Sequence, residues 1–444
     1  MKIVYLPLAR PTFSMPDAEA IFNASSGMLR SICESASVEM IAPSILLTSP
    51  EDLDAFLAKV ENPALIIYQC TTFIGSDFVS ELIRRFDCLV VVWSLREPSI
   101  DGGRLKLNSL TGAFSAANSL LAQGHAFRFL FGNVDEVFLP IKKIVSAVAM
   151  RTCLRNLTMG VIGTQPAGFR FGEIDEAVLK DKLGVSVKRI AVSEIIKTAS
   201  EYRQEDYAEA TAELKSRTKG WETLPEEICD KHARLQTAYR EFIAKEGINT
   251  VASRCWPDFF NEYGTAVCAT LSFLNDTGVP TSCETDMGGA ISMYIGSTLT
   301  GGATYFGDPV AIDDSCNALV FWHCGAGATS LSRKIEGAKI GKHPNRKIGP
   351  TMEFGLKEGA VTVMRLGKLK DGFRMMSMKG EALNEPQKFC GTSVAIRPLN
   401  GSPTDKINQL VNDGWEPHFV VAYGEITEEL RLLCQLLNID YKEY

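Results

Sequence analysis

Apolar runs of strand length alternate with amphipathic helical patterns over the first 150 residues of the chain. The apolar runs cover residues 3–8, 38–42, 64–70 and 88–93, and helical patterns such as 50–59 lie between them. Strand–helix alternation at this spacing predicts a parallel, doubly wound sheet. We therefore expect an N-terminal α/β domain over residues 1–150.

The same alternation continues over residues 151–304, with longer polar helices. The charges of these helices indicate solvent-facing surfaces or subunit contacts. We expect a second, central α/β domain here. Its predicted strands are 158–163, 187–192, one ending at 256, and 279–283, and its predicted helices are 200–219, 225–247, 257–275 and 288–299.

The pattern changes from residue 305 onward, where short strands are separated by Gly, Asn and Pro turns. Asp371-Gly372 has the composition of a hairpin turn. We expect a β-rich, barrel-like C-terminal domain over residues 305–444. The fold class is thus two doubly wound parallel-sheet α/β domains followed by this β-rich domain. Its predicted strands are 318–324, 360–366, 372–378, 392–397 and 418–422, with a last helix over 426–437.

Composition narrows the classes of partner. The formal net charge of −7 argues against nucleic acid or an anionic membrane as the main partner. The twelve cysteines form no C-x-x-C pair, which is typical of reduced thiols in a cytosolic protein. The first apolar run is too short for a signal peptide, and no run approaches the ~20 residues of a membrane-spanning helix. We expect a cytoplasmic protein.

Two acidic residues, Glu262 and Asp286, stand 24 positions apart, each where a predicted strand gives way to a helix. Ligands collect at the carboxyl ends of strands in open α/β sheets, so these two carboxylates can converge on one crevice. Hard oxygen ligands of this kind suit Mn²⁺ or Mg²⁺. Helix capping and the helix dipole also explain both acids, without any function.

Five histidines are present, and two of them lie in distinctive surroundings. His323 precedes the glycine-rich stretch Gly325–Gly327, and His418 leads directly into an apolar strand. Each is ambiguous by itself, since a structural imidazole fits both positions. Gly160 and Gly163 do not have the G-x-G-x-x-G spacing, which argues against a nicotinamide-linked dehydrogenase.

Taken in order, these motifs resemble those of the L-fucose/L-arabinose isomerase superfamily. The resemblance rests on the spaced acids Glu262 and Asp286, the stretch Cys283-Glu-Thr-Asp286, the stretch Trp322-His-Cys-Gly325, and the ending around Pro417-His418. It extends over essentially the whole chain. It implies two α/β domains, a β-rich C-terminal domain and a manganese-dependent aldose–ketose isomerase.

The resemblance also implies roles for particular residues. Glu262, Asp286 and His418 would hold Mn²⁺, with Mg²⁺ or Co²⁺ as possible replacements, and Glu262 and Asp286 would transfer protons through a cis-enediol. The enzyme would be a homo-oligomer with sites near subunit interfaces and a small-molecule sugar as substrate. The residues expected to contact that sugar are Trp93, Arg96, Glu97, Phe169, Trp256 and His323. The alternative is a non-catalytic sugar-binding or regulatory protein of the same fold.

A locally basic segment bears on the substrate. Six cations against Glu336 give residues 333–347 a net charge of +5 within an acidic protein. A solvated loop explains this charge. Recognition of a phosphorylated or sulfonated sugar explains it too, because such groups favour Arg and Lys partners. Remote branches of the superfamily handle the sulfonated hexose sulfoquinovose, so an anionic sugar stands beside a fucose- or arabinose-type sugar. The six cations are Arg333, Lys334, Lys339, Lys342, Arg346 and Lys347.

Overall fold

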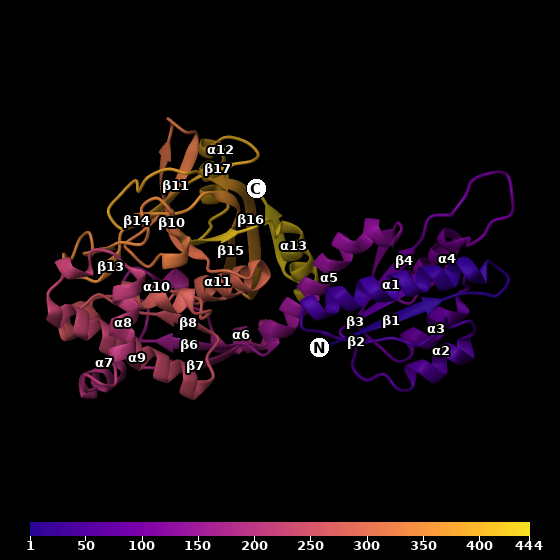
Figure 1. The fold of residues 1–444 in the computed structure, drawn as a ribbon, viewed down its shortest axis with the longest axis horizontal. Coiled ribbons are helices and arrows are strands. Elements are labelled where there is room, and N and C mark those ends of the chain that lie inside the picture. The colour runs from indigo at the N-terminus through magenta and orange to yellow at the C-terminus, as the bar shows by residue number, and fades with distance from the viewer. The chain divides into compact units, whose positions relative to one another are not determined.

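A computed structural model describes all residues, 1–444, and the chain divides into two compact units. The first unit is Met1–Thr152 and the second is Cys153–Tyr444. Each unit is built on its own parallel sheet, and the second also contains the large β-rich part of the chain (Figure 1).

The first unit is organised on a five-stranded parallel sheet in the order β2-β1-β3-β4-β5. Its central strands are buried on both faces, which explains their continuous apolar sequences. The strands are β1 (Lys2–Leu8), β2 (Glu39–Ile41), β3 (Leu65–Cys70), β4 (Leu89–Ser94) and β5 (Phe127–Phe131).

Helices cover both faces of this sheet. Val4 and Leu6 of β1 pack in one core with apolar residues of α2, α3 and α4, while Tyr5 points the other way and stacks on Phe22 of α1. Successive side chains of β1 therefore point to opposite faces of the sheet and pack in two separate apolar layers. The helices are α1 (Met15–Ser35), α2 (Pro50–Leu57), α3 (Asp77–Ile83), α4 (Ser109–Ala122) and α5 (Val134–Arg155), the last crossing into the second unit.

The second unit begins with a four-stranded parallel sheet in the order β7-β6-β8-β9. Its strands are β6 (Thr158–Ile162), β7 (Ser186–Ile190), β8 (Thr250–Ser253) and β9 (Thr281–Ser282). The associated helices are α6 (Glu176–Leu183), α7 (Val192–Glu201), α8 (Ala208–Arg217), α9 (Glu226–Glu246), α10 (Cys268–Asp276) and α11 (Met287–Thr300), with short helical turns at Arg170–Gly172, Trp221–Thr223 and Phe259–Tyr263.

The rest of the second unit is an eight-stranded sheet whose pairing β17–β16 closes six of its strands into a barrel. An apolar core that includes Phe321, Val363, Met376 and Ile396 fills it. The strands are β10 (Tyr305–Asp313), β11 (Ala318–His323), β14 (Phe354–Gly355), β15 (Gly359–Leu369), β16 (Gly372–Ala382), β17 (Thr392–Pro398), β18 (Phe419–Tyr423) and β19 (Asp440–Glu443); the small ribbon β12 (Ile340–Gly341) and β13 (Thr351–Met352), the turn Thr329–Leu331 and the helices α12 (Pro403–Asn412) and α13 (Thr427–Leu437) accompany it.

Helix α11 packs against both the parallel sheet and the barrel, through β8 and β9 on one side and β15 and β18 on the other (Figure 1). Small residues at its start make this possible. A Cβ atom on Gly289 would lie 2.4 Å from the ring of Phe306, and one on Gly288 would lie 2.9 Å from the carbonyl oxygen of Leu366. The Gly-Gly pair therefore lets the start of α11 lie close to the barrel.

The predicted fold class is confirmed: parallel α/β sheets precede a β-rich, barrel-like region. The division of residues 151–444 at 304/305 stays a prediction, because both sheets belong to one compact unit. The single helix predicted over 257–275 is wrong: a π-helical turn at Phe259–Tyr263 ends at Gly264, and α10 starts separately at Cys268.

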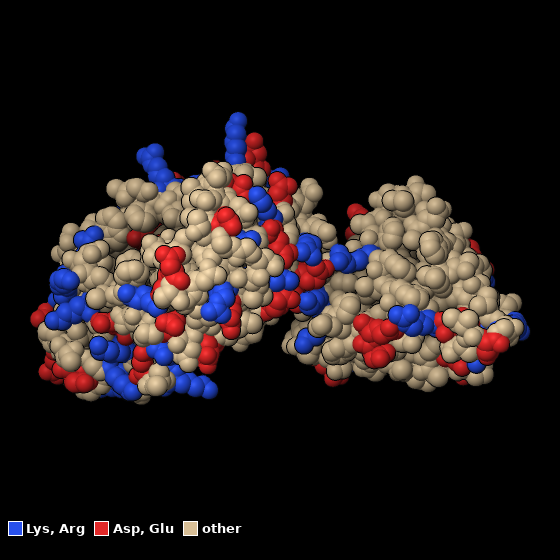
Figure 2. Space-filling view, turned by 90° about the horizontal axis from the view of Figure 1, so that it is seen from above, with Lys and Arg blue, Asp and Glu red and all other residues tan.

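No helix of the structure combines the length and the hydrophobicity that crossing a bilayer requires. On the face shown in Figure 2, Lys and Arg side chains are interspersed with Asp and Glu side chains rather than gathered into one patch of a single sign.

Candidate active site

Three neighbouring barrel strands bring one acid and two histidines into a row. In the antiparallel register Asp308 of β10 lies opposite Trp322 of β11, and Gly307 lies opposite Phe419 of β18. His323 therefore ends β11, and His418 precedes β18, beside Asp308. All three side chains sit at the same end of the barrel, although they are far apart in sequence.

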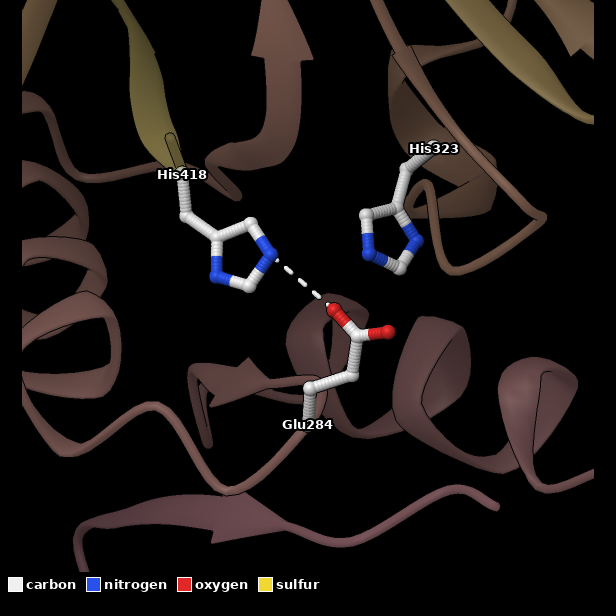
Figure 3. Close-up of side chains that lie close together, drawn as sticks. All are labelled: Glu284, His323 and His418. Carbon is white, nitrogen blue, oxygen red and sulfur yellow. Dashed lines mark ion pairs between the residues drawn. The ribbon is translucent and has the colours of Figure 1, made fainter. Parts of the chain in front are cut away.

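Glu284 reaches this row from the parallel sheet. It lies between β9 and α11, and both it and Thr285 have a left-handed backbone, with φ of 57° and 53°. Non-glycine residues rarely adopt this conformation, and strained backbone of this kind is concentrated at active sites and ligand-binding segments. Figure 3 shows Glu284, His323 and His418 pointing toward one another. Each offers one potential ligand atom, and these atoms all lie within 4.8 Å of one another.

His418 is held by carboxylates at both ring nitrogens. Its Nδ1 lies 2.8 Å from Oδ2 of Asp286, and its Nε2 lies 3.0 Å from Oε2 of Glu284 and 3.5 Å from Oδ1 of Asp308. Asp286 thereby fixes the orientation of the imidazole and leaves Nε2 facing the acids of the cluster. This carboxylate–histidine arrangement is the one that usually orients a metal-binding imidazole.

Asp286 is itself fully buried and heavily bonded. Arg365 of β15 donates to its two oxygens at 2.7 and 2.9 Å, and the backbone N–H of Gly289 donates to Oδ1 at 2.8 Å. Asp286 thus caps α11 as a helix N-cap would, and in addition ties that helix to the barrel. Its oxygens have no room to face a sugar.

The surrounding charges set the pKa values of both residues. Burial alone would raise the pKa of Asp286, but Arg365 and His418 outweigh it and lower the pKa below that of a free carboxyl group. Burial would lower the pKa of His418, but the hydrogen bonds of Asp286 and Glu284 raise it to about 10. The site therefore favours positive charge at Nε2 of His418.

The cluster opens into a cavity of about 300 Å³. Its wall combines three large aromatic side chains with polar and charged groups, and Oδ1 of Asp308 is buried there without a hydrogen-bond partner. Burial raises the pKa of Asp308, which favours a carboxyl group that can exchange a proton. The lining residues are Phe169, Trp256, Glu284, Asp308, Trp322, His323, Cys324, His343, Asn345 and Arg346.

The residues present fit a divalent metal ion. Glu284, His323 and His418 offer one carboxylate and two imidazoles, a donor set that suits Mn²⁺, Co²⁺ or other divalent first-row ions. Nδ1 of His323 lies 3.5 Å from Sγ of Cys324, which leaves Nε2 as its free nitrogen. The orphaned oxygen of Asp308 beside Nε2 of His418 is a further acceptor that a cation would satisfy.

The structure does not bring Glu262, the predicted catalytic and metal-binding acid, to this cluster. In its π-helical turn Phe259, Phe260 and Tyr263 point inward, so Glu262 is exposed and lines a separate depression with Arg254 and Asp258. Of the predicted metal-binding residues, His418 stands in the cluster, and Asp286 stands behind it as the partner of its other nitrogen.

The structure places the residues predicted to contact sugar in two groups. Phe169, Trp256 and His323 line the cavity. Trp93 is fully buried in the first unit, where Nε1 donates to the carbonyl oxygen of Gly132, and its contact with sugar stays a prediction.

Arg96 and Glu97 already have partners within the first unit. Arg96 pairs with Glu136 at 2.8 Å, and Glu97 accepts backbone N–H bonds from residues 106–108. Their contact with substrate stays a prediction.

Sequence reasoning missed Glu284, Asp308 and Arg365. Glu284 stands inside Cys283-Glu-Thr-Asp286, so the stretch was found but the neighbouring acid was chosen. Asp308 and Arg365 carry no signal in the sequence, because only strand register and the packing of α11 reveal their neighbours.

Comparison with known proteins gives full-length relatives. The chain is 41% identical over 448 residues to the sulfoquinovose isomerase of Clostridium sp. (strain MSTE9), and 40% identical over 447 residues to that of Priestia megaterium. Each match covers 100% of this chain and 99% of the relative. A search of protein-family models finds no match. A solute-binding protein from Agrobacterium vitis matches 68% of this chain and 89% of its own at 12% identity with a TM-score of 0.18, a likeness that carries no argument.

Proposed function

Because the chain belongs to the sulfoquinovose isomerases, which are sugar isomerases of the fucose/arabinose isomerase type, we propose that it is a metal-dependent enzyme that interconverts sulfoquinovose and its 2-ketose. The observation that carries the proposal is the convergence of Glu284, His323 and His418 in one cavity, beside the unpartnered oxygen of Asp308. Mn²⁺ is the metal we favour, with Mg²⁺ or Co²⁺ as replacements.

Glu284, His323 and His418 would hold the metal, and Asp286 would keep His418 in place through Nδ1. Bound there, a divalent cation supplies Lewis-acid stabilisation for negative charge that develops on the sugar oxygens. Trp256 adds to this arrangement, because its Nε1 donates to Oε1 of Glu284 at 3.1 Å. The two oxygens of Glu284 therefore contact different groups: Oε1 accepts the hydrogen bond from Trp256, and Oε2 faces Nε2 of His418.

Asp308 is the group we assign to proton transfer between C2 and C1. Isomerisation moves one proton between these carbons through a cis-enediol and a second between O1 and O2. Oδ1 of Asp308 is buried and free of other partners, and its raised pKa lets it both take and return a proton. Phe169, Trp256 and Trp322 form the aromatic part of the cavity wall beside these groups.

An isotope experiment tests the proposed function. The purified protein, stripped of metal with a chelator, should not convert sulfoquinovose, and added Mn²⁺ should restore conversion to the ketose. In deuterated water the recovered aldose should gain deuterium at C2, detected by NMR, because a base removes that proton. A metal-stripped protein that isomerises at the full rate would contradict metal dependence. Complete retention of hydrogen at C2 during ketose formation would contradict removal of that proton by a base.

Metal binding should also depend on pH. His418, with a pKa of about 10, and His323, raised to about 9 despite its burial, are both protonated near neutral pH in the metal-free protein. An imidazole must lose its proton to bind a metal, so affinity rises with pH until those pKa values are passed. We expect the Kd for Mn²⁺ to fall by about tenfold or more per pH unit between pH 6 and 8. Calorimetry in buffers of different ionisation enthalpy should show proton release; a pH-independent Kd would contradict this ligand set.

We also propose a homo-oligomer, in which Arg96 and Glu97 stand near a neighbour's site. Exposed apolar side chains of the first unit support it, because α4, β5 and α5 leave several large ones in contact with solvent. Buried subunit contacts commonly use such side chains. They include Phe114, Leu121, Phe129, Phe131 and Leu139.

A further inference from the structure

Arg346 stands out among the six cations of segment 333–347 because it lines the cavity that contains Glu284 and His323. Its guanidinium lies 4.9 Å from the ring centre of Trp256 and 5.3 Å from that of Phe260. No acidic side chain pairs with it. It is thus a cation whose position is fixed by aromatic faces and whose N–H groups are left for another partner.

The other cations of the segment are either close to acidic side chains or exposed. Arg333 pairs with Glu336 at 2.6 Å and donates to Asn384, and Lys339 lies 3.8 Å from Glu353. The remaining cations, Lys334, Lys342 and Lys347, have exposed side chains and do not line the cavity. The two explanations of this basic segment therefore apply to different residues: most of it is solvated or paired, and one arginine faces the site.

His343 holds the turn that carries Arg346. The backbone N–H groups of Asn345 and Arg346 both donate to Nδ1 of His343 at 3.3 Å, and the imidazole is buried edge-on against Phe260 at 5.2 Å. Nδ1 is thus an acceptor and the proton lies on Nε2. A buried side chain of this kind presets the turn, so that Arg346 is placed before a ligand arrives.

We propose that Arg346 binds the sulfonate of a C6-sulfonated hexose and so selects an anionic sugar over a neutral one; this inference rests on the proposed isomerase function. A single indole separates the two ends of the site. Trp256 donates from Nε1 to Glu284 on one side and stacks under Arg346 on the other. When C1 and C2 of a hexose lie at Glu284 and His418, its C6 substituent is several bonds away. That separation is comparable to the size of the Trp256 indole.

Charge fixes the orientation of the sugar. Glu284 and Asp308 repel a sulfonate from the end of the cavity where they lie, while Arg346 attracts it at the other. A planar guanidinium can donate two parallel hydrogen bonds to two oxygens of a sulfonate, as it does to carboxylates and phosphates. The position of the sulfonate therefore determines where the sugar lies along the cavity and brings C1 and C2 to the proton-transferring groups.

Substitution of Arg346 tests this subsite. Arg346→Gln should lower kcat/KM for sulfoquinovose by about 10²-fold, mostly through KM, because a charge-assisted bidentate contact is lost. The same variant should change kcat/KM for quinovose, the matched sugar without the sulfonate, by less than about twofold. Arg346→Lys should fall between wild type and Arg346→Gln for sulfoquinovose, since charge remains and the fork does not. Lys334→Gln, an exposed cation of the same segment, is the matched control and should leave both sugars unaffected.

The outcomes separate this inference from the proposed function. Equal losses on both sugars, or no loss on sulfoquinovose, would overturn the subsite while leaving the isomerase intact. Wild-type protein that prefers quinovose to sulfoquinovose would already overturn the substrate class before any variant is made. Circular dichroism of Arg346→Gln verifies the fold, and because Arg346 is exposed we expect the wild-type spectrum.

Discussion

Replacing Glu284 by Gln is expected to lower kcat/KM by about 10³- to 10⁴-fold while leaving the fold intact. The amide keeps the shape of the side chain and can still accept the hydrogen bond from Nε1 of Trp256. It removes the negative charge that faces Nε2 of His418, and with it one of the three groups we assign to the metal. Steady-state kinetics of ketose formation and calorimetry with Mn²⁺ measure both losses.

Glu262→Gln is the matched control, since it makes the same chemical change at the acid that the sequence indicated. Glu262 is exposed on its π-helical turn and lines a different depression, so activity should stay within about twofold of wild type. The opposite result, in which Glu262→Gln loses activity and Glu284→Gln keeps it, would support the assignment made from sequence spacing and refute the one made from geometry.

The two acids show how far sequence reasoning reaches. The sequence pattern located the strand–helix junction at Cys283–Asp286, because a helical pattern over 288–299 follows the short strand predicted over 279–283. It could not choose between Glu284 and Asp286, since two successive left-handed residues redirect the side chains in a way that no local pattern reveals. The junction was predictable and the choice of ligand was not.

The remaining gaps have the same physical origin. His323 and His418 were singled out by their sequence surroundings and by the family resemblance, but their meeting with Asp308 depends on barrel register across β11, β10 and β18. Strand β19 has the polar sequence Asp-Tyr-Lys-Glu and was missed because it is an edge strand with no apolar face of its own. Long-range pairing, which the sequence does not encode locally, decides all of these.

Asp286 and Arg365 form the interaction with the largest expected effect on stability. Their side chains are 0% and 1% exposed, so neither charge has water to replace a lost partner. Asp286→Asn leaves Arg365 buried without a counter-charge and should reduce the free energy of unfolding by about 3–5 kcal/mol. The unfolding midpoint should fall by roughly 10 °C. The Kd for Mn²⁺ should also rise by about 10- to 100-fold, because His418 loses the carboxylate that orients it.

Two comparisons test whether burial is the cause. Glu381→Gln removes the acid of the Arg397–Glu381 pair, whose side chains are 44% and 54% exposed, and should cost under about 1 kcal/mol. The double variant Asp286→Asn with Arg365→Met removes both buried charges and should regain most of the stability lost by the single change. It should not regain Mn²⁺ affinity, because His418 still lacks its carboxylate partner. If the double variant were as unstable as the sum of its single changes, the loss would come from disrupted packing of α11 against the barrel and not from an unpaired charge.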